Sequence, residues 1–164
     1  MSQCTLILVR HSDPEYFAMS DHSRPLTDLG LRRAHELGIK LRAEVGDIEL
    51  GVSSTAVRAW QTFDEIAKNL PMRTTYKDRS IYSAGAESLI ETIHSLPGES
   101  ALIVGHQPTI GHVGYLIGDD SAKADLGTGV GKATALIIQS EGSFADFRPG
   151  ANLPVRIVTV PRLL

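Results

Sequence analysis

The sequence predicts an α/β fold: a three-layer α/β/α sandwich around a mostly parallel sheet, with an antiparallel C-terminal edge. Two observations predict it. Residues 5–9 and 100–104 are uncharged, aliphatic-rich runs, the pattern of parallel strands that are buried on both faces. Amphipathic helical patterns separate such runs along most of the chain, and only near the C-terminus does a turn, at 141–142, replace the helix.

Length and composition limit the possible functions. The chain has 164 residues, 42% hydrophobic and 21% charged, which suits a single globular domain over 1–164. A net charge of −3 argues against a nucleic-acid binder, which normally carries a basic excess. No apolar run approaches the ~20 residues of a membrane span. We therefore expect neither nucleic acid nor a membrane as a partner.

The N-terminus and the cysteine content predict the compartment. The first residues, from Met1 to Thr5, lack the basic segment of a signal peptide and lead directly into a strand. Cys4 is the one cysteine, so no internal disulfide can form, and its expected role is that of a packed thiol at a strand start. These features predict a cytoplasmic protein.

The first strand is expected to end at about Arg10, because Pro14 and the polar residues around it do not extend a strand. A polar loop, 12–26, follows. Thr27 is a favourable helix N-cap. Apolar residues then recur at spacings of three and four, which predicts an amphipathic helix that ends near Gly46.

The next elements repeat the strand–helix order. A short strand is expected over 48–53, followed by a helix that Ser54 or Thr55 would cap. Its apolar positions continue to about Leu70, where Pro71 ends the helix. Residues 72–76 are mostly polar strand formers, which predicts a third strand at the edge of the sheet.

A loop over 77–85 is expected to lead to a helix over 86–96, which a Pro-Gly pair ends. The buried-type strand 100–104 follows. A short helix is then predicted over 109–117, and the chain next reaches a glycine-rich run at 127–131.

The C-terminal third reads as the antiparallel edge. A strand is predicted over 133–139, and a short strand over 144–147 follows the turn. Residues 155–160 are expected to form either one more edge strand or an extended arm.

Cationic and imidazole side chains follow three of the predicted strands. Arg10 and His11 end the first strand, Arg58 lies in the first turn after the second, and His106 follows the fourth. The carboxyl ends of parallel strands share one edge of the sheet, so we expect these residues to converge. Two arginines and two imidazoles beside a helix N-terminus would bind a dianionic phosphoryl group. The alternative is a capped strand with a surface arginine and a half-buried histidine.

A metal site is the competing use of paired histidines. His106 and His112 lack accompanying cysteines or suitably spaced carboxylates, and the nearby arginines repel a cation, so we expect no metal. The glycine-rich run 127–131 lacks Walker A spacing, and Lys132 is followed by Ala133. We therefore expect a flexible loop there and no cofactor.

Four segments, in register along most of the chain, resemble motifs of the histidine phosphatase (phosphoglycerate-mutase-like) superfamily. They are Val9-Arg10-His11-Ser12, Arg24-Pro-Leu-Thr-Asp-Leu-Gly30, Ser53-Ser-Thr-Ala-Val-Arg58-Ala-Trp-Gln-Thr62 and Val104-Gly-His106-Gln-Pro108. The short length and the His-Gln-Pro segment most resemble the SixA-type phosphohistidine phosphatases.

The resemblance implies residue roles. His11 would be the nucleophile and would form a phosphohistidine that water hydrolyses. Arg10, Arg58 and His106 would hold the phosphoryl oxygens and stabilise the charge of the transition state. Arg24 would add a contact from the loop, unless it is a surface arginine before a helix. Ser12 replaces the family's usual glycine and is small enough to leave the pocket open.

The general acid is the larger departure from the family. Mutase-like members supply a glutamate from an insertion after the third strand, whereas this chain has no cap insertion and only residues 77–87 there. Glu87 lies where a helix N-terminal acid is expected in any case. Asp13 and Glu15, just past the nucleophile, are the alternative proton donors.

The sequence thus predicts a phosphatase that works through a phosphohistidine enzyme intermediate and acts on protein phosphohistidine. A small-molecule phosphomonoesterase is the alternative, so the partner is a phosphorylated protein or a small phosphorylated metabolite. A non-catalytic phosphate- or phosphoprotein-binding module is a third possibility, and the presence of both histidines and both arginines argues against it.

Overall fold

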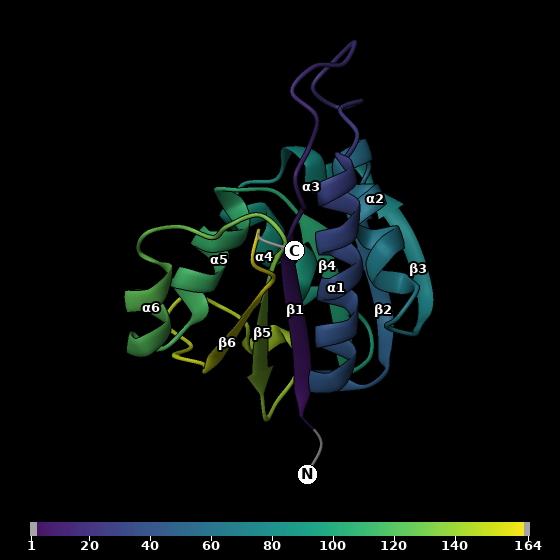
Figure 1. Ribbon diagram of the computed structural model, residues 1–164. Helices are drawn as coiled ribbons and strands as arrows, with labels where there is room; N and C mark the ends of the chain where they lie inside the picture. The colour runs from purple at the N-terminus through teal and green to yellow at the C-terminus, as the bar shows by residue number, and fades with distance from the viewer. Residues whose placement is uncertain (1–2, 163–164) are drawn as a thin grey trace.

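A six-stranded sheet forms the middle layer of the computed structural model, which describes residues 3–162 (Figure 1). The strand order is β3-β2-β4-β1-β5-β6. The strands are β1 (Cys4–Arg10), β2 (Ile48–Ser54), β3 (Met72–Asp78), β4 (Ser100–Gly105), β5 (Thr134–Ser140) and β6 (Val155–Thr159). The prediction that the N-terminus is not a signal peptide includes Met1 and Ser2, which lie outside the described residues.

The first four strands are parallel, β5 is antiparallel to β1, and β6 is antiparallel to β5. The predicted mostly parallel sheet with an antiparallel edge is therefore confirmed. Of the two expectations for the tail, the edge strand is correct. The mostly polar β3 lies at the opposite edge, as predicted.

Helices cover both faces of the sheet (Figure 1). They are α1 (Asp28–Val45), α2 (Val57–Ala67), α3 (Arg79–Ser83), α4 (Ala86–His94), α5 (Thr109–Ile117) and α6 (Asp120–Leu126). Along β1, Ile7 and Val9 pack with α1 and α2, whereas Leu6 and Leu8 pack with the remaining helices. All four side chains are fully buried, so β1 is the central strand of two hydrophobic cores.

The N-terminus of α1 lies against the residues that follow β1. The Thr27 hydroxyl accepts the Gly30 N–H at 3.0 Å, which confirms the predicted N-cap. A Cβ at Gly30 would collide with the backbone carbonyl of Asp13. Glycine at this position therefore allows the helix to approach the end of β1 closely.

Local side-chain hydrogen bonds stabilise two elements of the C-terminal half that differ from the prediction. The expected strand over 144–147 is instead the 3₁₀ helix η1 (Phe144–Asp146). Ser143 and Asp146 form a capping box there, and this box favours a helical turn over an extended chain. The helix α6 was not predicted, although Asp119 caps it by accepting the Ala122 N–H at 2.9 Å.

Two boundaries near the sheet edge also differ. The predicted loop over 77–85 contains the end of β3 and the short helix α3, which Asp78 caps. The predicted caps of α2, Ser54 and Thr55, are wrong, because the helix begins after Ala56 without a side-chain cap. Ser54 bonds His106 and lies in the site described below.

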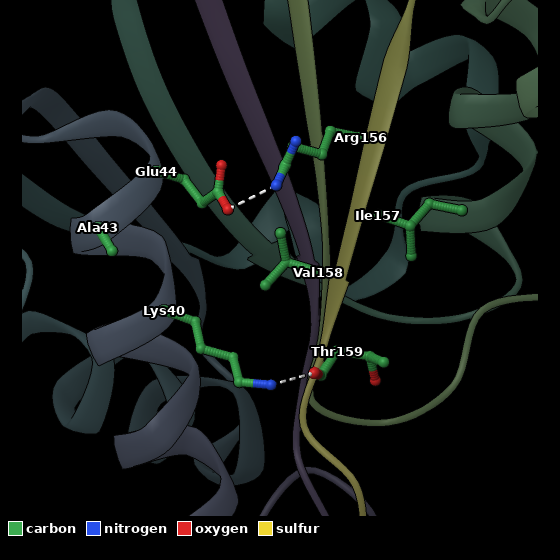
Figure 2. A pocket seen from close by; sticks show the side chains of 7 residues that line it. All are labelled: Lys40, Ala43, Glu44, Arg156, Ile157, Val158 and Thr159. Carbon is green, nitrogen blue, oxygen red and sulfur yellow. Dashed lines mark hydrogen bonds and ion pairs between the residues drawn. The ribbon is translucent and has the colours of Figure 1, made fainter.

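An open groove of about 690 Å³ separates α1 from the edge strand β6 (Figure 2). Arg156 pairs with Glu44 at 2.8 Å across it, and the Lys40 ammonium donates to the Thr159 carbonyl at 3.0 Å. These contacts tie α1 to the last strand. No helix within residues 3–162 has the length and apolar character to cross a membrane.

Candidate active site

The strands β2, β4 and β1 are neighbours in the sheet, and their carboxyl ends bring the predicted residues together. Arg10 pairs with Gly105 in the register of β1 and β4, so the next residues, His11 and His106, lie side by side. Their ring centroids are 5.3 Å apart. Arg58, in the first turn of α2, places its Nε 3.4 Å from the Nε2 of His11.

The hydrogen bonds of His11 fix its tautomer. The Nδ1 atom lies 2.8 Å from the Ser12 carbonyl oxygen, which can only accept, so Nδ1 carries the proton. The pKa of His11 is lowered to about 3, mainly by burial; the Ser12 carbonyl opposes this shift, and the charges of His106, Arg58 and Arg10 add to it. At neutral pH the ring is therefore neutral, with a lone pair on Nε2.

The guanidinium of Arg58 is buried and held from the loop that precedes α1. Its two terminal nitrogens donate to the Asp21 carbonyl at 2.7 Å and to the Asp21 carboxylate at 3.0 Å. The Tyr82 hydroxyl donates to the same carboxylate at 2.7 Å. This bond and the charge of Arg58 lower the pKa of Asp21 to about 2, so the carboxylate stays ionised.

Arg10 is oriented by the glycine-rich run. One terminal nitrogen donates to the Val130 carbonyl at 2.8 Å, and the side chain of Val130 is buried in the core. Residues 127–131, expected to be only a flexible loop, thus hold an arginine of the site. The Nε of Arg10 is buried without a hydrogen-bond partner among the described residues.

His106 likewise leaves one ring atom for a ligand. Its Nε2 lies 2.8 Å from the Ser54 hydroxyl, while its Nδ1 is buried without a partner within residues 3–162. Burial, the charge of Arg58 and further neighbours lower the pKa of His106 to about 4. Buried polar atoms are rarely left unpaired, so Nδ1 of His106 and Nε of Arg10 are candidate contacts for a polar ligand. The third such atom, Oδ1 of Asp13, faces Arg162 at 3.9 Å instead.

Both imidazoles titrate below their ordinary value of 6.5. Between about pH 6.5 and pH 4, the unfolded chain binds protons that the folded chain does not, so the free energy of unfolding falls as the pH falls. We expect His11→Gln to reduce the loss of stability between pH 7 and pH 5 by about 2 kcal/mol. Urea denaturation of both proteins at the two pH values measures this difference, and equal losses would contradict it.

Asp13, a predicted proton donor, is buried in an ion pair with Arg33 at 2.6 Å. Burial raises the pKa of Asp13, but the hydrogen bond and the charge of Arg33 outweigh this effect, and the pKa lies below its ordinary value. Arg33 also donates to the backbone carbonyls of Lys132 and Val160. The ion pair gives Asp13 a structural role and does not support proton donation, which for Asp13 stays a prediction.

Breaking this buried ion pair leaves the carboxylate poorly compensated. We expect Arg33→Met to lower the free energy of unfolding by about 3 kcal/mol, because the buried carboxylate of Asp13 then keeps only the exposed Arg162, 3.9 Å away, as a charged partner. Adding Asp13→Asn to this variant removes the orphan charge and is expected to restore part of the stability. Chemical denaturation of the three proteins checks this, and a loss below about 1 kcal/mol in the single variant would contradict it.

The remaining predicted residues lie at the rim. The side chain of Glu15 is exposed, and its backbone carbonyl accepts the Nε of Arg24 at 2.8 Å. Arg24 also pairs with Asp21 at 3.3 Å, so both of its contacts brace the loop. Glu87 is exposed in the first turn of α4. Among the described residues, neither glutamate forms a hydrogen bond or ion pair with the arginines or histidines that converge at the site.

Residues without a predicted role at the site also support it. Thr62 accepts the Ser12 N–H at 2.9 Å and donates to the Arg58 carbonyl at 2.7 Å, which ties the end of β1 to α2. Ser54 and Thr62 lie inside a quoted motif, but Ser54 was predicted only as a helix cap and Thr62 had no predicted role. Asp21 lies three residues before Arg24, a spacing that alone predicts nothing. Tyr82 had no signal in the sequence.

Comparisons with known proteins identify the family. A model of the histidine phosphatase superfamily (branch 1) matches residues 6–80. An uncharacterized protein of Mycobacterium tuberculosis (strain CDC 1551 / Oshkosh) is 31% identical over 150 residues, 87% of this chain and 93% of that protein. The phosphohistidine phosphatase SixA of Escherichia coli (strain K12) is 28% identical over 117 residues, 66% of this chain and 70% of that protein.

Solved structures share the fold. A candidate phosphohistidine phosphatase SixA from Nakamurella multipartitia superposes with a TM-score of 0.83 at 27% identity, over 98% of this chain and 99% of that chain. The protein histidine phosphatase SixA complexed with tungstate superposes with a TM-score of 0.76 at 18% identity, over 94% and 96% of the two chains. With motifs, fold and relatives in agreement, the chain belongs to the histidine phosphatase superfamily, in which it is similar to the SixA-type phosphohistidine phosphatases.

Proposed function

We propose that this protein removes phosphoryl groups from histidine residues of other proteins, with His11 as the nucleophile. Its family makes the chain a phosphatase that works through a histidine. The observation that carries the proposal is the neutral His11 ring, whose Nε2 lone pair lies among buried cationic groups. Such an arrangement combines a nucleophile with preorganised stabilisation of a phosphoryl anion.

Two displacements complete the reaction. The substrate phosphoimidazole first takes a proton from solvent on its free ring nitrogen. The Nε2 of His11 then attacks the phosphorus, and the bond between phosphorus and the substrate nitrogen breaks, so that its electron pair stays on the nitrogen and the substrate ring leaves neutral. Water then attacks the phosphorus of phospho-His11, which releases inorganic phosphate and returns the neutral ring. In both steps Arg10, Arg58 and Nδ1 of His106 hold the phosphoryl oxygens and stabilise the charge that develops on them.

The ionised carboxylates support a phosphohistidine substrate over an ester. Expelling an alkoxide from a phosphate ester requires a placed proton donor. Asp13 and Asp21 contact arginines at the site, and both have lowered pKa values, so neither holds a proton at neutral pH. When phosphohistidine is protonated on its other ring nitrogen, the imidazole leaves as a neutral ring and needs no such acid.

The short connection between β3 and α4 supports a protein substrate. It consists of residues 79–85, most of which form the small helix α3. A connection of this length supplies no cap over the site, and an uncapped site admits a side chain presented by another protein. The E. coli relative that carries the name phosphohistidine phosphatase favours the same substrate class. The cytoplasmic setting, predicted from the single cysteine, is part of the proposal.

A comparison of leaving groups tests the function. We expect a higher kcat/KM for a histidine-phosphorylated protein than for a serine phosphomonoester, because only the ester needs a proton donor. Glu15→Gln and Glu87→Gln, at the two exposed candidate acids, should leave this preference unchanged. A preference for the serine ester that either variant abolishes would replace the proposal with a phosphomonoesterase that uses that glutamate.

The rate of p-nitrophenyl phosphate hydrolysis, compared with the rates for the two substrates above, separates the remaining alternatives. Its leaving group is acidic and needs little protonation, so it reports the intact phosphoryl site. A protein that binds phosphate but hydrolyses none of the three compounds would be a binding module, and the proposed function would be wrong.

A further inference from the structure

The loop between β1 and α1 carries large apolar side chains that the described part of the chain leaves uncovered. Tyr16, Phe17 and Met19 are 86%, 87% and 103% exposed. Together with Ala18 they form the apolar tip, residues 16–19. In Figure 1 this loop rises beyond the carboxyl ends of the strands, the edge that holds the site. Exposed apolar side chains that gather at one place mark interaction surfaces.

Hydrogen bonds hold the stem of this loop on both sides of the apolar tip. Pro14 and Leu26 form an antiparallel bridge, and the Glu15 N–H donates to the Pro25 carbonyl at 2.7 Å. On the far side of the tip, the hydroxyls of Ser20 and Ser23 lie 3.1 Å apart within a turn. These hydrogen bonds hold the two sides of the loop in place. A partner that binds the apolar tip therefore avoids most of the entropy cost of ordering the loop.

Hydrogen bonds also join the same loop to the site. Asp21 accepts two hydrogen bonds from Arg58, at 2.7 Å and 3.0 Å. The next residue, His22, accepts the Val57 N–H at 3.0 Å through its carbonyl, and its ring contacts the Thr55 hydroxyl at 2.8 Å. A molecule that covers the apolar tip is therefore held by the loop that contacts Arg58 at the phosphoryl site.

We propose that the apolar tip is the docking surface for the protein substrate, a folded protein whose phosphorylated side chain is surrounded by apolar side chains. This inference rests on the proposed function and adds the surface that selects among phosphoproteins. The phosphoryl group would enter beside His11 while its apolar surroundings cover Phe17 and Met19. A free phosphorylated metabolite is too small to reach both places.

Charge argues against a lipid surface as the occupant. The exposed carboxylate of Glu15 flanks the apolar tip on one side, Arg24 and Arg58 pair with Asp21 on the other, and the chain carries a net charge of −3. Segments that bind anionic membranes instead place lysines and arginines beside their apolar residues. A protein surface with apolar side chains around the phosphorylated residue suits the tip better.

The test uses two versions of one small helical carrier protein with a single exposed histidine, phosphorylated with phosphoramidate. One version has leucines, the other glutamines, three and four residues from the histidine, where they share its helix face. Free phosphohistidine is the third substrate. The enzymes are the wild type, the double variant Phe17→Ser/Met19→Ser and a matched control, Ile39→Ser/Ile157→Ser, whose isoleucines are exposed on α1 and β6.

We expect the wild type to favour the leucine carrier over the glutamine carrier by about tenfold in kcat/KM, mainly through KM, since docking adds binding energy outside the reacting group. The Phe17→Ser/Met19→Ser variant should lose this preference, and the control should keep it. All three enzymes should hydrolyse free phosphohistidine at the same rate.

Several results would overturn the docking surface alone: no carrier preference in the wild type, a preference that the tip variant keeps, or one that the control loses. Binding of the wild type to vesicles containing phosphatidylglycerol, lost in the tip variant, would make the tip a membrane contact instead. A wild-type dimer that the tip variant abolishes in sedimentation would make it a self-association surface. Failure of the wild type to hydrolyse either carrier as well as free phosphohistidine would instead refute the proposed function, and the docking surface with it.

Discussion

Replacing His11 by alanine should abolish turnover and leave the protein folded. Removing the nucleophile of a covalent mechanism typically costs on the order of 10⁶ in kcat. The ring contributes little to either hydrophobic core, because His11 lies just past the carboxyl end of β1. The rate with histidine-phosphorylated protein, together with the circular dichroism spectrum, measures both expectations.

Chemical trapping locates the intermediate. Wild-type enzyme quenched during turnover should carry an acid-labile, alkali-stable phosphoryl group on His11, and His11→Ala should carry none. His112→Ala, which changes an exposed histidine on α5, is the matched control and should retain the label. A label on any residue other than His11 would remove the proposed mechanism.

The second large effect concerns Arg58. We expect Arg58→Ala to cost on the order of 10²–10³ in kcat/KM, as loss of a charge-stabilising donor typically does. Arg58→Lys should rescue poorly, because one ammonium cannot approach His11 and also make the two bonds to Asp21. Arg10→Ala, which removes the arginine held by Val130, should cause a loss of similar size.

Arg42→Lys is a suitable control for Arg58→Lys, because Arg42 is half exposed near the end of α1 and pairs with Asp47 at 3.2 Å. Its activity should equal that of the wild type. Near-wild-type activity of Arg58→Lys, by contrast, would show that Arg58 supplies only a point charge. Steady-state kinetics with one phosphohistidine protein compares the three enzymes.

The central part of the site could be predicted from the sequence because it depends on chain direction. Parallel strands deliver their next residues to one edge, so the strand pattern alone places Arg10, His11 and His106 together. The contact between Tyr82 and Asp21 joins residues 61 positions apart through a loop and a five-residue helix. No periodic pattern encodes such a contact, because it depends on how the loop folds back over α2.

The sequence did contain a signal for the buried position of Arg33. Arg33 lies four residues before Leu37 and eight before Leu41, on the apolar stripe of α1, and a lone charge in such a stripe requires a buried partner. The partner is Asp13, which the sequence offered as a proton donor. A carboxylate next to a nucleophile fits either role, and only the position of Arg33 decides between them.

The bonds of Arg33 to the end of the chain have a practical consequence. Two of its nitrogens donate to the carbonyl of Val160, at 3.3 Å and 2.7 Å, and a third holds the carboxylate of Asp13, two residues after His11. The segment after β6 thus supports, from a distance, the loop that follows β1. Affinity tags and crystallisation truncations that disturb residues around Val160 would unsettle the site from the opposite end of the sequence.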